Sequence, residues 1–300
     1  KKVASFNSGR REKATKEIKV KAISELRSKY NLEDLLDLAN IARSTYYYYL
    51  TKLSKSDKYE DIKNKIRDIF SKSRETYGHR RITLELHKFG FKINKNTVLR
   101  LMNEIKLKCC VRMKKYKSYR GSVGKICDNI LKREFNASGI NKKWATDITE
   151  FSLFGEKLYL SPVIDLWNKE IVSYTISRRP VLKQVIDMIE GAFRKLPKNT
   201  KLILHSDQGW QYQHRSYQMK LKEKGIIQSM SRKGNCLDNS VIENFFGILK
   251  SELFYLKKFN SIDHFKEELV EYIRFYNNER IKINLKGMSP VQYRKTFLSK

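Results

Sequence analysis

Strand-like and helix-like segments alternate between residues 140 and 258, and this alternation places acidic residues at the ends of predicted strands. Residues 144–154 are rich in Thr, Ile, Phe and Trp, which favour a strand that carries Asp147 near its start. Asp207 directly follows the apolar run 201–205, which predicts a short buried strand with the carboxylate just beyond its end. We therefore expect an α/β layered domain, because alternating strands and helices are typical of that class.

A third acidic residue, Glu243, stands in a helical setting. Leucine, isoleucine and phenylalanine recur at helical spacing over residues 237–253, and Asp238 is the expected N-cap of this helix. At about 100° per residue, Asn239, Glu243 and Lys250 fall near one side of the helix and the apolar residues on another. One helix can thus bury its apolar stripe and still direct a carboxylate and a cation into a cleft.

Three carboxylates held close together suit metal-assisted phosphoryl transfer. Mg²⁺ prefers hard oxygen ligands, and two such ions roughly 4 Å apart activate a weak oxygen nucleophile and shield the charge that develops on phosphorus. Spacing by itself is weak evidence, because the chain has 32 Asp and Glu and an isolated carboxylate is usually solvated or paired with lysine. The two strand-end settings and the helical setting are what favour a catalytic group made of Asp147, Asp207 and Glu243.

Several ordered motifs carry a family resemblance. Around the three acids stand Trp-Ala-Thr-Asp-Ile-Thr (144–149), His-Ser-Asp-Gln-Gly-x-Gln-Tyr (205–212) and Asn-Cys-x-Asp-Asn-Ser-x-x-Glu-x-Phe-Phe (235–246), with Lys250 after them. Tyr-Asn-x-x-Arg (276–280) and Leu-Lys-Gly-Met-Ser-Pro (285–290) follow. Over most of its length the chain therefore resembles bacterial transposases of the insertion-sequence-three family, whose catalytic domain is similar to retroviral integrase.

The resemblance implies a ribonuclease-H-like fold with a mixed sheet and a DDE active site, in which Asp147, Asp207 and Glu243 hold two Mg²⁺ (or Mn²⁺) ions. Such an enzyme first uses water to nick a transposon end and free a 3′-hydroxyl. That hydroxyl then attacks another phosphodiester, with no covalent protein intermediate. The implied partner is double-stranded DNA, both transposon ends and target, bound by a homo-oligomer. Positions expected to support the site or to contact DNA beside it are Lys250, Asn239 and His205.

Helical segments fill the first third of the chain. Residues 32–39 and 41–50 resemble a helix-turn-helix, and the amino-terminal residues of its second helix are those that reach base edges. Ser and Thr at such positions also bind phosphate. The tyrosine run 46–49 fits the packing of a small helical bundle equally well, so it is assigned no base contact. The candidate DNA-binding residues here are Arg43, Ser44 and Thr45.

A second helical unit is expected over residues 53–108. Its third helix follows an interruption at Gly90 and can be capped by Asn94 or Asn96. Basic residues near the helix starts could grip the backbone of a transposon end, although exposed basic residues on small helical domains are more often only solvated. The candidates are Arg80, Arg81, Lys95 and Arg100.

A basic connector follows, with ten Lys and Arg and a single acid between residues 106 and 133. A segment of this composition either follows a phosphate backbone or is a solvated linker, and composition does not distinguish the two. The candidate DNA-binding residues in it are Lys114, Lys115 and Lys117.

The charge balance indicates the kind of partner. The chain has 63 Lys and Arg against 32 Asp and Glu, a formal net charge of +31, which favours nucleic acid. An AT-rich coding sequence would raise Lys, Ile and Asn but would not by itself explain the excess over acids. The four cysteines lack zinc-ligand spacing, so we expect reduced thiols. No apolar run approaches the roughly twenty residues that span a membrane, and we expect a cytoplasmic protein of the bacterial nucleoid.

These inferences combine into an α/β fold, a ribonuclease-H-like mixed-sheet catalytic domain preceded by all-α helix-turn-helix modules. The expected function is a DNA transposase that binds the terminal repeats of an insertion sequence, nicks them and carries out 3′-hydroxyl strand transfer. Two alternatives stay open, a DNA-binding regulator derived from a transposase and a ribonuclease-H-like nuclease. The expected boundaries are 1–52 and 53–108 for the helical modules, 109–139 for the connector, 140–258 for the catalytic domain and 259–300 for a C-terminal helical tail.

Overall fold

The structure, a computed structural model, describes residues 16–54, 57–110, 127–197, 200–232 and 236–298 of the chain. The connector residues Lys114, Lys115 and Lys117 lie outside the described residues. The chain divides into two compact units, Lys1–Lys65 and Ile66–Lys300. In the described ranges, no helix is both long enough and apolar enough to cross a membrane.

Helices of the first unit close around one small apolar core. A helical segment at 16–26 is followed by α2 (Leu32–Ala39) and α3 (Arg43–Ser54). The Asn31 side chain caps α2 by accepting the backbone N–H of Glu33. Apolar side chains from all three segments form the core, which consists of Val20, Ile23, Leu35, Leu36, Ile41, Tyr46 and Tyr49.

Three further helices form a second helical segment. α4 (Glu60–Lys72) runs across the division between the units, and α5 (His79–Lys88) and α6 (Lys95–Glu104) follow it. Asn94 caps α6 by accepting the backbone N–H of Asn96, so the first of the two predicted caps is the one that forms. Each helix buries one apolar face: Ile66, Ile69 and Phe70 of α4, Ile82 and Leu86 of α5, and Val98, Leu101 and Met102 of α6.

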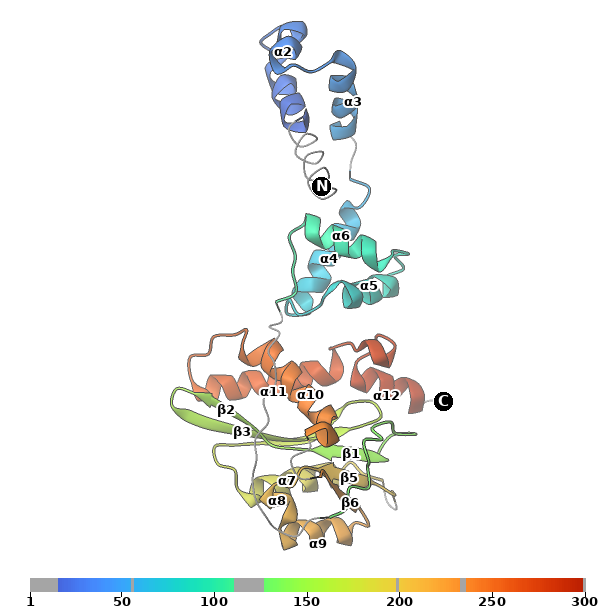
Figure 1. Ribbon diagram of the computed structural model, residues 1–300, viewed down its shortest axis with the longest axis vertical. Coiled ribbons are helices and arrows are strands. Elements are labelled where there is room, and N and C mark those ends of the chain that lie inside the picture. Colours follow the sequence, from blue (N-terminus) through green and yellow to red (C-terminus); the bar gives the residue numbers. More distant parts are fainter. Residues whose placement is uncertain (1–15, 55–56, 111–126, 198–199, 233–235, 299–300) are drawn as a thin grey trace. The chain divides into compact units, whose positions relative to one another are not determined.

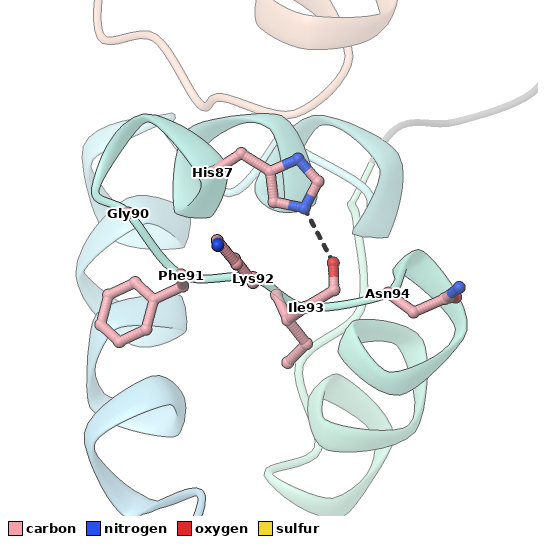
Figure 2. Close-up of a pocket in the computed structure, with 6 residues that line it drawn as sticks. All are labelled: His87, Gly90, Phe91, Lys92, Ile93 and Asn94. Atoms are coloured by element: carbon pink, nitrogen blue, oxygen red, sulfur yellow. Dashed lines mark hydrogen bonds between the residues drawn. The ribbon is translucent and has the colours of Figure 1, made fainter.

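The turn between α5 and α6 is held by a side chain. His87 Nε2 lies 2.8 Å from the carbonyl oxygen of Ile93, and Gly90 takes the positive φ of 85° that begins the turn. These residues border a hollow of about 510 Å³, which Figure 2 shows together with Phe91 and Asn94. The contact between His87 and Ile93 fixes the chain just before the start of α6.

A mixed sheet forms the centre of the second unit. β1 (Lys143–Thr146) and β2 (Thr149–Leu153) pair antiparallel with successive halves of the long strand β3 (Glu156–Asp165). β4 (Ile171–Ser177) also pairs antiparallel with β3. The strands β1 and β2 are separated only by Asp147 and its neighbour, so the first catalytic candidate lies at the junction between two strands.

The parallel part of the sheet brings strand ends together. β5 (Ile203–Ser206) runs parallel to β1, and β6 (Ile227–Met230) runs parallel to β5. Because neighbouring parallel strands end on the same side, the carboxyl ends of β1, β5 and β6 meet at one edge of the sheet. Together with the helices before it, this mixed sheet confirms the predicted fold class.

Helices cover both faces of the sheet (Figure 1): α7 (Leu182–Phe193), α8 (Trp210–Gln213) and α9 (Arg215–Glu223) on one, and α10 (Ser240–Leu249) and α11 (Ile262–Asn278) on the other. Trp144 packs in the cluster of the first face and Ala145 in the cluster of the second. These neighbours in β1 point to opposite layers because successive side chains of a strand alternate.

The helix that carries Glu243 differs from its predicted form. The sequence pattern predicts one continuous helix to residue 253, whereas α10 follows a short 3-10 turn, η1 (Cys236–Asn239), and gives way at Lys250 to a π turn, η2 (Lys250–Phe254). In the wider turn Glu252 and Leu253 are both buried.

The C-terminal residues form part of the same layer. α11 packs in one cluster with α10, and η3 (Ile283–Leu285) and α12 (Pro290–Leu298) follow it. The expected boundary at residue 258 therefore passes between two helices that share a core.

Candidate active site

Asp147 follows the last residue of β1 and is partly buried. One of its carboxylate oxygens accepts the backbone N–H of Ile148 at 2.7 Å. Burial raises the pKa of Asp147 well above its usual range, and the charges of Asp207 and Glu243 raise it further. The three predicted acids therefore influence one another in the fold.

Asp207 follows β5, the strand parallel to β1, so its carboxylate emerges at the same sheet edge as that of Asp147. Its Oδ1 accepts the backbone N–H of Gly209 at 2.8 Å, and burial raises its pKa. A Cβ added at Gly209 would lie 3.0 Å from this oxygen and 2.9 Å from the side chain of Gln211. The glycine of the Asp-Gln-Gly motif is thus needed for the close turn that orients Asp207.

Glu243 lies in the first turn of α10, and Asn239 ties the start of that helix to the sheet. The Asn239 side-chain amide donates to the carbonyl oxygen of Thr146 at 3.2 Å, directly before Asp147. Its own Oδ1 is buried and has no hydrogen-bond partner among the described residues. Asn239 therefore holds α10 against the end of β1.

Lys250 lies at the end of α10 and presents its amine to the same site. Its Nζ lies 5.4 Å from the centre of the Phe151 ring, and its charge interacts with Asp147 and Glu150. Burial lowers the pKa of Lys250, while the two acids raise it. Glu243 and Lys250 are seven residues apart, which is about two helical turns, so both lie on the helix side that faces the acids.

The donor set fits a divalent metal ion. The three carboxylates supply hard oxygen ligands, and the mutual repulsion that raises the pKa of Asp147 would be relieved by a cation. The unpartnered Oδ1 of Asn239 is a further oxygen beside Thr146. Among the residues that the structure describes, no three Asp, Glu, His or Cys side chains already enclose a space for a metal ion.

His205 has a structural position inside the sheet. It is fully buried, with Nδ1 2.9 Å from the Ser229 hydroxyl and Nε2 3.2 Å from the Ser231 hydroxyl. Burial lowers its pKa to about 4, so the ring is neutral at physiological pH. The residue supports the site by fastening β5 to β6, and its burial places it away from DNA.

The candidates of the first helical module lie at the start of α3. Arg43 and Ser44 are exposed and Thr45 is half-buried, while Arg43 Nη1 lies 3.2 Å from Glu33. Within the tyrosine run, Tyr46 and Tyr49 are buried in the core, and the other two are exposed. Packing of the bundle therefore accounts for Tyr46 and Tyr49 only.

Arg81 differs from the other three candidates of the second helical module. Arg80 and Lys95 are exposed at the starts of α5 and α6, and Arg100 pairs with Glu104 on the surface of α6. Arg81 instead lies 3.6 Å from the buried Glu252 of η2 and 5.3 Å from the centre of the Tyr77 ring. Its guanidinium is engaged within the second unit.

Sequence patterns missed several features of this domain. The predicted N-cap role of Asp238 is wrong, because the N-cap residue of α10 is Asn239 and the Asp238 carboxylate instead binds Arg133 and Arg232. The tie between Glu252 and Arg280 was also missed. Trp210, three residues after Asp207, is about half exposed, at 51%. The only local signal for it was an aromatic residue inside a motif of polar residues.

Family comparisons match both halves of the chain. Residues 137–236 and 243–298 match models described as integrase core domain, and residues 57–116 match a model described as an HTH-like domain. The matched ranges contain the three acids and the helices α5 and α6.

Whole-length relatives extend this match. The chain is 54% identical over 275 residues to InsK of insertion sequence element IS150 from Escherichia coli (strain K12), covering 92% of this chain and 97% of the relative. It is 31% identical over 279 residues to the transposase InsF for insertion sequence IS3A from the same strain, covering 90% and 96%.

Among solved structures, the catalytic core domain of HTLV-2 integrase in complex with magnesium is similar, with a TM-score of 0.41 and 16% identity over 51% of this chain and 96% of that one. The family assignment rests on the relatives that match along nearly their whole length. This chain belongs to the IS3 family of DDE transposases.

Proposed function

We propose that this transposase cuts and joins DNA with Asp147, Asp207 and Glu243 as its catalytic acids, acting on the terminal repeats of its own insertion sequence. One arrangement supports this assignment above the others. β1 and β5 lead Asp147 and Asp207 to the same sheet edge, and the Asn239 contact with Thr146 holds the Glu243 helix beside them.

The three acids would hold two Mg²⁺ (or Mn²⁺) ions, which activate an oxygen nucleophile and shield the charge on the reacting phosphate. Lys250 places its amine where its charge interacts with Asp147, and it would bind the DNA backbone there. Asn239 keeps α10 in position, and the Asp207–Gly209 hydrogen bond fixes the orientation of that carboxylate.

Two displacements at phosphorus account for the reaction. In the first, a water oxygen forms a bond to phosphorus, the bond to the 3′-oxygen breaks, and that oxygen leaves as a 3′-hydroxyl after gaining a proton. In the second, the same 3′-hydroxyl attacks a target phosphodiester and loses its proton, and a target 3′-oxygen leaves. No bond to the protein forms in either step.

The helical segments would bind double-stranded DNA at the element's ends. Exposed basic and polar residues stand at the start of α3 and of α6, where helices of this type meet DNA. The net charge of +31 supports a polyanionic partner. We place the active form in the bacterial cytoplasm, on the nucleoid, as a homo-oligomer that holds paired ends and the target.

The decisive experiment is cleavage and strand transfer on labelled DNA that carries the element's terminal repeats, with Mg²⁺ or Mn²⁺ added. Wild type should give end-specific nicks and joined products. Asp147→Asn and Glu243→Gln should each lose both products, by on the order of a hundredfold or more, because each removes the charge of a metal ligand. Glu267→Gln, which makes the same change at an exposed site on α11, is the control.

End binding separates the possible outcomes. Both active-site variants should bind terminal-repeat DNA as wild type does, since neither residue belongs to the helical segments that precede the sheet, which are the ones proposed to bind the ends. Tight binding by wild type with no metal-dependent product would favour a DNA-binding regulator, and nicks without joined products would favour a nuclease.

A further inference from the structure

Asp238 is a fully buried carboxylate that ties Arg232, six residues before it, to the distant segment 129–133. It accepts a hydrogen bond from the Asn129 amide at 2.9 Å and one from Arg133 Nε at 2.8 Å. Arg232 binds it through Nε at 2.9 Å, Nη2 at 3.0 Å and the backbone N–H at 3.0 Å. These bonds hold the pKa of Asp238 far below its usual range, so the group stays ionised.

The two arginines that Asp238 holds remain at the surface. Their side chains are 42% exposed for Arg133 and 59% exposed for Arg232. Two guanidinium groups share one carboxylate, so the three groups together carry one positive charge. A surface ion pair would ordinarily cost side-chain entropy for little gain, but here a buried anion fixes both cations in one orientation.

Local backbone geometry also serves the placement of Arg133. Lys132 and Arg133 both adopt left-handed conformations, with φ of 46° and 64°, which side chains other than glycine rarely take. Ser229 on β6 accepts the backbone N–H groups of Ile130 and Leu131 and fixes the segment before them. Strained residues held by their surroundings cluster at functional sites.

Hydrogen bonds also connect this group to the residues next to Asp147 and Asp207. Asp238 is followed by Asn239, which binds Thr146 next to Asp147. Arg232 is preceded by Ser231, whose carbonyl oxygen accepts from Gln208, the residue after Asp207. Arg232 and Asp238 therefore each adjoin a residue that is hydrogen-bonded to the neighbour of a catalytic aspartate, and Arg133 joins this group through Asp238.

We propose that Arg133 and Arg232, organised by Asp238, form a clamp for a phosphate of the DNA backbone beside the active site. The clamp rests on the proposed function, because DNA must pass this edge of the sheet for its phosphate to reach Asp147 and Asp207. Guanidinium groups suit this role, since their planar donors match phosphate oxygens. Two arginines held in advance lose less freedom on binding than mobile ones.

Salt dependence of binding tests the clamp. Affinity for a terminal-repeat duplex is measured without divalent metal over a series of salt concentrations, for wild type, Arg133→Gln and Arg232→Gln. Each variant should reduce the slope of log affinity against log salt by about 0.9, the value for one phosphate contact. Arg274→Gln is the matched control, because Arg274 is also 59% exposed and pairs with Glu271 and Glu279 on the surface. Slopes for both clamp variants equal to that of Arg274→Gln would overturn the proposal.

A second measurement changes the DNA as well as the protein. Single phosphates around the scissile bond are replaced by neutral methylphosphonates, and the loss of affinity is compared between wild type and Arg232→Gln. At the phosphate held by the clamp, wild type should lose affinity several-fold more than the variant, because the variant has already lost that contact. Equal losses at every phosphate would show that the arginines are only internal ties.

The wild-type control keeps the two proposals distinct. If wild type cleaves and joins the ends but the variants keep the wild-type slope and phosphate pattern, the clamp alone is wrong. If the clamp variants change the salt slope and the phosphate pattern while wild type forms no product with metal, the proposed function is wrong and the phosphate site stands.

Discussion

Lys282 shows how a single side chain can depend on charges that are distant in the sequence. Its amine is largely buried near Arg280 and Arg81, and burial together with these positive charges lowers its pKa to about 7. Lys250, by contrast, is a partly buried amine whose neighbours are the acids Asp147 and Glu150. Burial therefore lowers the pKa of both lysines, but the acids beside Lys250 oppose this shift, whereas the arginines beside Lys282 add to it.

The Lys282 shift predicts a pH dependence of stability. Between pH 7 and the unfolded value of 10.5, the unfolded chain holds this proton and the folded protein does not. The free energy of unfolding should therefore rise with pH above 7, by about 1–2 kcal/mol more in wild type than in Lys282→Met between pH 7 and pH 9. Urea unfolding at the two pH values measures this difference, and parallel behaviour of the two proteins would contradict it.

Individual residues also show what can be predicted from the sequence and what cannot. The grouping of Asp147, Asp207 and Glu243 could be predicted because each acid stands inside a local pattern that sets its own backbone. The buried position of His205 could not be predicted, because its partners Ser229 and Ser231 lie on and just after another strand, β6. The buried state of that ring is decided by strand pairing, which the motif around it does not encode.

At the scale of elements, the π turn η2 is the place where three segments meet. Glu252 accepts hydrogen bonds from Arg280 at 2.7 Å and 2.6 Å and from the Tyr272 hydroxyl at 2.8 Å. Arg81 of α5 lies on the same carboxylate. Lys250 begins this turn, so the cluster fixes the end of the helix that carries the catalytic Glu243.

Breaking this buried ion pair should be costly. Arg280→Met leaves the Glu252 charge buried without its main partner, so we expect a loss of about 3–5 kcal/mol in the free energy of unfolding. The double variant Glu252→Leu with Arg280→Met should recover part of that loss, because the carboxylate that the single variant leaves without its main partner is removed. Urea unfolding of the three proteins measures this, and a single variant as stable as the double one would refute the interpretation.

Helix α5 presents two adjacent arginines in different surroundings. Arg80 is exposed, whereas Arg81 pairs with Glu252. We expect Arg80→Gln to weaken end binding several-fold with unchanged stability, and Arg81→Gln to lower stability by about 1–3 kcal/mol. Fluorescence anisotropy and urea unfolding on the same two proteins would decide, and the opposite pattern would restore Arg81 as the DNA contact.

The presence of helices and strands was predicted better than the residues at which they end and the segments against which they pack. The strands and helices follow from hydrophobic periodicity, which acts over a few residues. The change from α10 to η2 at Lys250 was not predictable, because it accompanies the burial of Glu252 against Arg280, 28 residues away in the sequence.

At the scale of the whole molecule, positive charge is distributed over both compact units. Arg43 at the start of α3 belongs to the first unit, and Lys95 at the start of α6 belongs to the second. Both are exposed residues at the end of a helix that would meet DNA. A transposase with two such helices can recognise an element's end at more than one place along the duplex.

Two substitutions test whether both helices bind DNA without taking part in the chemical step. Arg43→Gln and Lys95→Gln should each weaken binding of terminal-repeat DNA several-fold, and the double variant should show the sum of the two free-energy losses. At saturating DNA the cleavage rate should stay within about twofold of wild type, because neither residue contacts the catalytic acids. A large fall in that rate would show that one of them acts in the chemical step instead.

The sequence alone determined the α/β class and predicted the three acids and a nucleic-acid partner, because periodicity, strand-end position and net charge are local or summed properties of the chain. Only the tertiary structure decided which basic residues stay at the surface. In the sequence Arg81 is a candidate DNA contact and Arg133 lies in a basic connector, yet their partners Glu252 and Asp238 lie more than a hundred residues away. An arginine's role depends on which carboxylate the fold brings to it, and that is set by packing between distant segments.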